Sequence, residues 1–177
     1  MNEIKIMKPL SDYSNEILSF NQPSMFKRIH ELRANGELIG TLQNKGFFGM
    51  HWDVSIQNQN WEIYRPCLWK SAIDIRPAGY EMSVANYTRK GFKSRGTVIL
   101  PKGEKLKINP RLFKGFTEIT TEQDECLVRI KTKMALRDKA EVTIGKKSEL
   151  INKYPWVIIL AYIITLEQRH HAAHASV

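Results

Sequence analysis

The sequence predicts a mainly β protein: a closed antiparallel barrel of about 12 strands around a buried hydrophobic C-terminal helix. Three observations support this fold. Short segments that alternate apolar and polar residues recur at the spacing of roughly 8–12 residues that is typical of all-β barrels and sandwiches. No long amphipathic helix separates them, and their polar alternate face argues against a parallel sheet buried on both sides. One wholly apolar segment, 155–166, follows the last of them.

The expected strands follow one another as hairpins. Asn35-Gly36 lies between two apolar-bearing runs, and this dipeptide is the strongest local signal of a hairpin because both turn residues accept positive φ. Trp52, Val54 and Ile56 alternate with polar residues, as in a half-buried strand. After a lead-in at 1–24 with one short strand, the expected strands lie at 26–32, 37–42, 52–57, 61–64, 72–76, 80–84, 97–100, 105–108, 116–120, 126–134 and 140–144.

The apolar segment near the end of the chain is expected to fill the barrel. It carries no charge, so protein or lipid must surround it on every side, and it is shorter than the roughly 20 residues of a membrane-spanning helix. Its periodicity leaves a buried central strand open as an alternative. A barrel of about 12 strands favours the helix, because side chains alone do not fill so wide an interior. We therefore expect a central helix at 155–168, followed by a flexible tail at 169–177. Its core residues are Trp156, Ile159, Leu160, Ile163 and Ile164.

Length and composition indicate one folded domain over 1–177. The chain has 177 residues, 42% of them hydrophobic and 25% charged, which is ordinary for a globular domain with its own core. The first residues lack the apolar core of a signal peptide. Cys67 and Cys126 are not in a metal-binding or redox spacing. We expect a cytoplasmic protein.

The sequence lacks the motifs of the common enzyme classes. It contains no glycine-rich phosphate loop, serine nucleophile elbow or His-Glu-x-x-His motif. We therefore expect no catalytic residue, no cofactor and no metal. The tail contains the only histidine cluster, His170, His171 and His174. Helical spacing would let it hold zinc or nickel, but a frayed polar tail is the simpler interpretation.

The positive charge is concentrated in one third of the chain. Residues 89–147 contain 16 Lys or Arg and 7 Asp or Glu, so the whole net charge of +9 lies there. Such a field attracts anionic partners, although a solvated surface that only keeps the protein in solution is an equal alternative. Side chains two residues apart on a strand project from one face. The residues expected to form a basic wall of the barrel are Arg89, Lys90, Lys93, Arg95, Lys105, Lys107, Arg129, Lys131 and Lys133.

The order of these features resembles the tubby C-terminal-like superfamily, which includes the LURP-one-related proteins and the phospholipid scramblases. Three parts of the sequence carry the resemblance: the early hairpin from Ile29 to Gly40, the aromatic-bearing segments at 61–64 and 80–82, and the terminal block 156–166. The resemblance implies a 12-stranded barrel closed around a hydrophobic helix. It also implies that a basic wall contacts phosphoinositide headgroups, although no residue-level motif of that site can be matched here.

These features favour a non-enzymatic binding module that engages anionic phospholipid headgroups or another phosphorylated ligand through the basic wall. Its expected location is cytoplasmic and peripheral at an anionic membrane surface. A nucleic-acid-binding barrel is the alternative, and it would need exposed aromatic residues for stacking, for which Phe92, Phe113 and Phe116 are the candidates. A scaffold protein without a small ligand stays open. A scramblase-like transporter is disfavoured, because the apolar segment is short and no acidic calcium loop is present.

Overall fold

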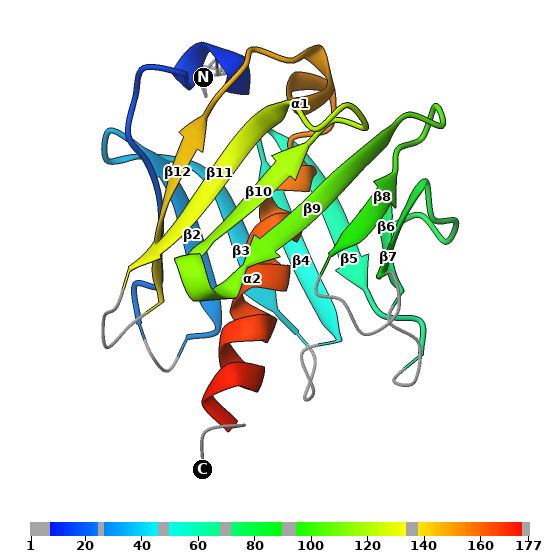
Figure 1. Ribbon diagram of the computed structural model, residues 1–177. Coiled ribbons are helices and arrows are strands. Elements are labelled where there is room, and N and C mark those ends of the chain that lie inside the picture. Colours follow the sequence, from blue (N-terminus) through cyan, green and yellow to red (C-terminus); the bar gives the residue numbers. More distant parts are fainter. Residues whose placement is uncertain are drawn as a thin grey trace, which may run out of the picture.

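The computed structural model describes residues 8–24, 27–45, 50–67, 72–89, 95–133 and 138–174. They form twelve strands, two α-helices and two short 3-10 helices (Figure 1). The strands are β1 (Leu18–Asn21), β2 (Ile29–Ala34), β3 (Glu37–Asn44), β4 (His51–Ile56), β5 (Gln59–Tyr64), β6 (Ile73–Pro77), β7 (Ala85–Arg89), β8 (Gly96–Ile99), β9 (Lys105–Arg111), β10 (Phe116–Thr120), β11 (Cys126–Lys133) and β12 (Lys139–Ile144). The helices are η1 (Leu10–Tyr13), η2 (Leu112–Lys114), α1 (Glu149–Lys153) and α2 (Trp156–His174).

The strands form a closed antiparallel barrel. Each strand pairs with its neighbours in the sequence, and β12 closes the sheet by pairing with β1. In the β2–β3 turn Asn35 and Gly36 have φ of 48° and 85°, the positive values that a two-residue hairpin turn requires. The predicted fold class is therefore confirmed, and the strand direction alternates so that β5, β7, β9 and β11 all end at the same end of the barrel (Figure 1).

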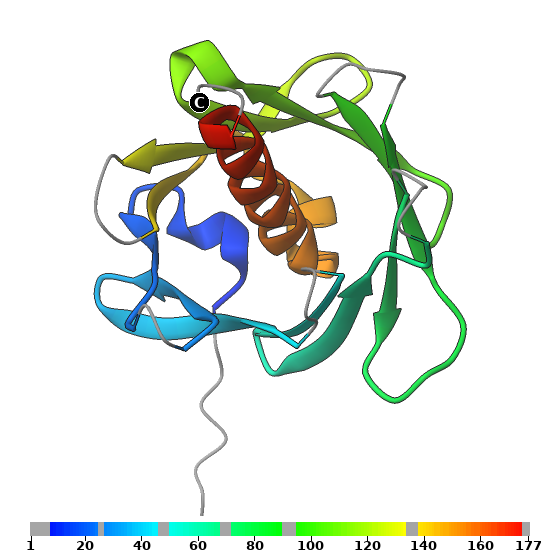
Figure 2. The same cartoon turned by 90° about the horizontal axis from the view of Figure 1, so that it is seen from below.

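The apolar terminal segment is a helix that passes through the barrel (Figure 2). Every side chain from Trp156 to Ile164 is buried, because the helix is enclosed by the ring of strands. The open choice between helix and central strand is thus resolved. The helix begins directly after Pro155, a residue suited to the first turn because its missing N–H is not needed there. It continues beyond 168 to His174, so the helix includes part of the segment expected to be a tail.

Polar contacts hold α2 in register inside the apolar core. The Tyr162 ring stacks on Phe20, with centroids 3.8 Å apart, and its hydroxyl is 3.0 Å from His30 Nδ1. The Thr165 hydroxyl lies 2.8 Å from the hydroxyl of Thr117 in β10. These buried groups are satisfied by one another, as an apolar interior requires. No helix among the described residues is long and apolar enough to cross a membrane.

One expectation about the strands needs correction. The predicted strand at 80–84 is instead the exposed connection before β7, so its alternating Tyr80 and Met82 face solvent. The strand begins at Ala85 instead, and its inward-facing residues include Ala85 and Tyr87. The short strand expected within 1–24 is β1, and it closes the sheet by pairing with both β2 and β12.

Candidate anion-binding wall

The outer face of β9, β10 and β11 carries most of the described residues of the basic wall. Arg129, Lys131 and Lys133 are exposed and alternate with the buried Val128 and Ile130. In β9, Lys105 is exposed and Lys107 half-buried, on either side of buried Leu106. β10 lies between them and pairs with both. β9 and β11 run in the same sense, with β10 antiparallel between them. Lys105 and Lys107 lie at the start of β9, whereas Lys131 and Lys133 lie at the end of β11, so the two pairs lie near opposite ends of the barrel.

Acidic neighbours already pair with four of these cations. Lys107 Nζ lies 2.9 Å from Asp124, and Lys105 Nζ 4.0 Å from Glu122, both in the β10–β11 connection. Arg129 donates to Glu118 on the adjacent strand β10, at 2.7 Å, and Lys133 forms an ion pair with Glu141 on β12. The wall is therefore less positive than the sequence alone suggests.

Arg89 does not lie on this wall. It ends β7 with its side chain directed into the barrel, where its guanidinium is 2.9 Å from Glu167 of α2. Arg65, which follows β5, donates to the same carboxylate oxygen at 2.5 Å. The three side chains are only 16–21% exposed. We call Arg65, Arg89, Glu167 and the buried Tyr87 the inner cluster. Its arginines hold α2 in the barrel rather than facing a ligand.

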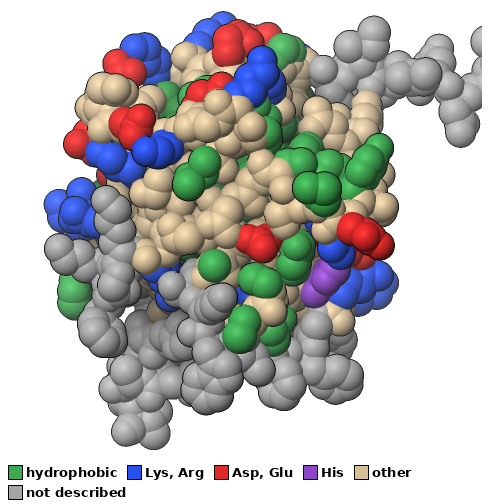
Figure 3. All heavy atoms as spheres, turned by 90° about the vertical axis from the view of Figure 1, so that its right-hand side faces the viewer, with side chains coloured by type: hydrophobic (Ala, Val, Ile, Leu, Met, Phe, Trp, Pro, Cys, Tyr) green, Lys and Arg blue, Asp and Glu red, His purple; other side chains and the backbone are tan. Residues whose placement is uncertain are grey.

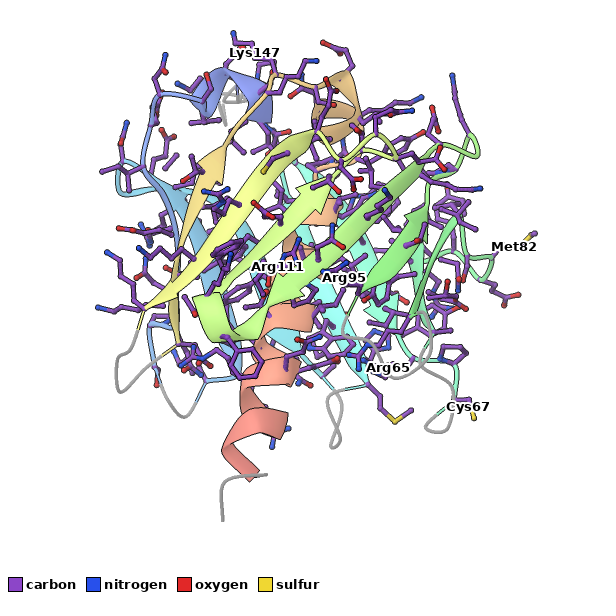
Figure 4. All side chains as sticks on the ribbon, viewed as in Figure 1. Arg65, Cys67, Met82, Arg95, Arg111 and Lys147 are labelled. Atoms are coloured by element: carbon purple, nitrogen blue, oxygen red, sulfur yellow. The ribbon has the colours of Figure 1, made fainter. Side chains whose placement is uncertain are left out.

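The remaining wall residues are dispersed. Arg95 is exposed directly before β8 (Figure 4), and Lys90 and Lys93 lie outside the described residues. On the right-hand side of Figure 1, the surface consists mainly of uncharged polar side chains and backbone with scattered hydrophobic side chains, and most of its charged side chains lie toward the margins (Figure 3). Most of the predicted wall residues that the structure describes therefore lie on β9 and β11.

Four exposed cations at one end of the β9–β12 part of the barrel form no ion pair within the part of the chain that the structure describes. They lie where β9 and β11 end and β12 begins, at the end of the barrel from which α2 emerges (Figures 1 and 4). Only one of them was among the predicted wall residues. We call these residues the open cations: Arg111, Lys114, Lys131 and Lys139.

Register shows how closely the open cations are arranged. Arg111 pairs with Phe116 across β9 and β10, and Phe116 pairs with Lys131 across β10 and β11. Strands in a sheet lie about 4.8 Å apart, so Arg111 and Lys131 flank Phe116 within roughly 10 Å of each other. Lys139 lies opposite Lys133. Spacing along each strand was visible in the sequence, but this pairing across strands was not.

The candidate stacking residues differ in availability. The Phe116 ring is covered by the Arg129 guanidinium, 4.9 Å from its centroid. Phe113 in η2 is fully exposed, at 107% of the reference area. Phe92 lies outside the described residues. One free aromatic ring among several cations gives little surface for stacking successive bases.

No nucleophilic or metal-binding arrangement was found among the described residues. Burial, and then the nearby charge of Glu118, raises the pKa of the Cys126 thiol, which leaves it protonated and weakly reactive. No group of three or more His, Cys, Asp or Glu in the described part of the chain is placed to hold a metal ion. The His170, His171 and His174 side chains are not among those described.

Comparison with known proteins supports the fold alone. No family model matches the chain, and no curated protein matches it in sequence. An X-ray structure of the Arabidopsis thaliana protein AT5G01750 matches it with a TM-score of 0.59 over 88% of this chain and 91% of that one. The two are 8% identical. The match agrees with the predicted closed β-barrel fold, and it does not extend to a ligand.

Proposed function

We propose that this protein is a non-enzymatic module of the tubby-like type that binds anionic phospholipid headgroups through its basic wall, peripherally at a cytoplasmic membrane surface. The observation that supports this is the group of open cations on β9 to β12. Unpaired, exposed lysine and arginine side chains keep their full charge available for phosphates, whereas cations with an acidic partner are partly neutralised. Four of them on one surface would present a local field of a single sign.

The expected strength follows from their number. Each lysine or arginine near an anionic membrane contributes about 1 kcal/mol. Four give about 4 kcal/mol, which corresponds to a dissociation constant of about 1 mM. Charge alone thus gives weak, salt-sensitive attachment, since the attraction falls off within a Debye length. A second contribution is needed for stable binding.

Vesicle co-sedimentation tests the proposal. The intact protein is mixed with neutral, phosphatidylserine-containing or phosphoinositide-containing vesicles at low and at physiological salt, with a single-stranded oligonucleotide as competitor. We expect binding to both anionic vesicles that weakens with salt and resists the oligonucleotide. Absence of binding to anionic vesicles would contradict the proposal, and displacement by the oligonucleotide would favour a nucleic-acid ligand.

A matched pair of variants locates the surface. Replacing Arg111, Lys114 and Lys131 by Gln should weaken vesicle binding about 100-fold, at about 1 kcal/mol per charge. The control replaces Lys102, Lys146 and Lys147 by Gln, which removes the same formal charge from exposed positions near the opposite end of the barrel, where Lys146 and Lys147 pair with Glu125 and Asp12. Equal losses in both variants would indicate attraction by net charge alone.

A further inference from the structure

We propose that the β9–β10 connection is a membrane-insertion tip: Phe113 enters the bilayer interface while the open cations contact the headgroups around it. This inference rests on the proposed binding of anionic lipid and names the part of the surface that enters the membrane. It also supplies the apolar contribution that the charges lack. The connection is the 3-10 helix η2 with Gly115 after it.

The tip has a defined conformation that presents Phe113. Gly115 has φ of +67°, a left-handed value that favours glycine and turns the chain back into β10. Its carbonyl accepts hydrogen bonds from both the backbone N–H and the hydroxyl of Thr132 in β11, at 3.1 and 3.2 Å. These bonds fix the tip against the strand that carries Lys131. Phe113 is therefore held outward by the fold.

The surroundings of Phe113 distinguish it from other exposed apolar residues. Single exposed hydrophobic side chains are common and need no explanation. Met82, for example, projects from the β6–β7 connection on another side of the barrel (Figure 4), beside Glu81 and without an open cation in the described connection. Phe113 instead lies next to Lys114 and two residues from Arg111. Lys131 lies on β11, the neighbour of β10, and Lys139 lies on β12, one strand further along the sheet.

Charge complementarity selects an anionic bilayer as the partner. Binding of peripheral elements to membranes scales with the buried apolar area plus the attraction of cations to anionic lipid. The tip offers both, with the exposed Phe113 beside the exposed Lys114. Long lysine and arginine side chains can reach the headgroups while their apolar stems and the phenyl ring lie deeper.

Tryptophan fluorescence tests insertion directly. Phe113→Trp is compared with wild type and with Met82→Trp in phosphatidylserine-containing vesicles whose acyl chains carry bromine as a quencher. We expect additional quenching, beyond the wild-type signal, for the Phe113 variant alone. Vesicle binding without that additional quenching would overturn the tip proposal while leaving the proposed function intact. Failure of the wild type to bind any anionic vesicle would overturn both.

Affinity measurements separate insertion from base stacking. Phe113→Ala should weaken binding to phosphatidylserine vesicles about tenfold, because the phenyl ring no longer leaves water, with an unchanged thermal melt. Phe113→Leu should retain most of the binding, since an aliphatic side chain also partitions into the interface. Equal losses in both variants would overturn insertion. Loss of oligonucleotide binding in both, with vesicle binding unaffected, would assign the tip to nucleic acid instead.

Discussion

The inner cluster and the open cations lie toward the same end of the barrel and differ in their partners. Inside, Arg65 and Arg89 share the carboxylate of Glu167 and are mostly buried. Outside, Arg111 and Lys131 are exposed and form no ion pair with the described residues, although Lys131 lies opposite Glu141, which pairs with Lys133. Both groups contain arginine, but the arginines of the inner cluster are paired with an acid inside the protein and the open cations are exposed to solvent.

The difference shows that the position of a cation, rather than its presence, decides what it can do. A partly buried arginine loses hydration and must be compensated within the protein, so its role is structural. An exposed, unpaired cation costs the fold little and remains available for a phosphate. We therefore expect changes in the inner cluster to alter stability and changes in the open cations to alter binding.

The largest effect is expected from removing the shared carboxylate. Glu167→Ala should lower the free energy of unfolding by about 3–5 kcal/mol, because it leaves two partly buried guanidinium groups without their acid. Chemical denaturation would measure it. The control, Glu125→Ala, removes an exposed partner of Lys146 and should change stability by less than about 1 kcal/mol. Similar small losses in both variants would show that the inner cluster does not anchor α2.

Local patterns predicted the strands of the barrel and the enclosure of the terminal segment, whereas the choice of a helix over a central strand came from the width of a barrel of about 12 strands. Alternation and the Asn35-Gly36 turn identify strands and a hairpin without knowledge of the rest of the chain. The continuous apolar run of α2 likewise requires enclosure wherever it lies. These patterns can be recognised in a single sequence because each involves only a few neighbouring residues.

The direction of Arg89 could not be predicted for a specific reason. The strand was expected at 80–84, where Tyr80, Met82 and Val84 alternate, and Arg89 was expected on the basic wall. With β7 at 85–89, the inward positions are those of Ala85, Tyr87 and Arg89. Because the strand lies later in the sequence than expected, Arg89 faces the interior of the barrel and not the outer basic wall. Its pairing with Glu167 further depends on how deeply α2 sits in the barrel, which no local pattern encodes.

The open cations were only partly predicted for a different reason. Lys131 follows from alternation in β11. Arg111 and Lys114 were visible in the sequence, but nothing local shows that they lack acidic partners while Lys105 and Lys107 have them. Whether a cation has an acidic partner depends on which connections lie beside it in the folded barrel, as the β10–β11 connection lies beside Lys105 and Lys107.

One substitution in the inner cluster and one among the open cations should have opposite effects on stability and on vesicle binding. Arg89→Gln should lower the free energy of unfolding by about 1–3 kcal/mol, since a charged hydrogen bond to Glu167 is lost, and should leave vesicle binding of the folded protein unchanged. Arg111→Gln should weaken vesicle binding about fivefold and change stability by less than about 0.5 kcal/mol. Denaturation and co-sedimentation would be measured on both variants. A binding loss for Arg89→Gln without a stability loss would place the ligand at the inner cluster.

The smallest effect is expected from freeing one paired cation. Lys133 lies directly opposite Lys139, but its own charge is taken up by Glu141. Glu141→Gln would convert Lys133 into a further open cation next to Lys131 and should strengthen binding to phosphatidylserine vesicles by up to about fivefold at low salt. Stability should change by less than about 1 kcal/mol, because both partners are substantially exposed. The gain should vanish at high salt, where exposed charges are screened. Unchanged vesicle binding at low salt would mean that an additional free cation at Lys133 does not strengthen attachment. Attachment would then depend mainly on Phe113.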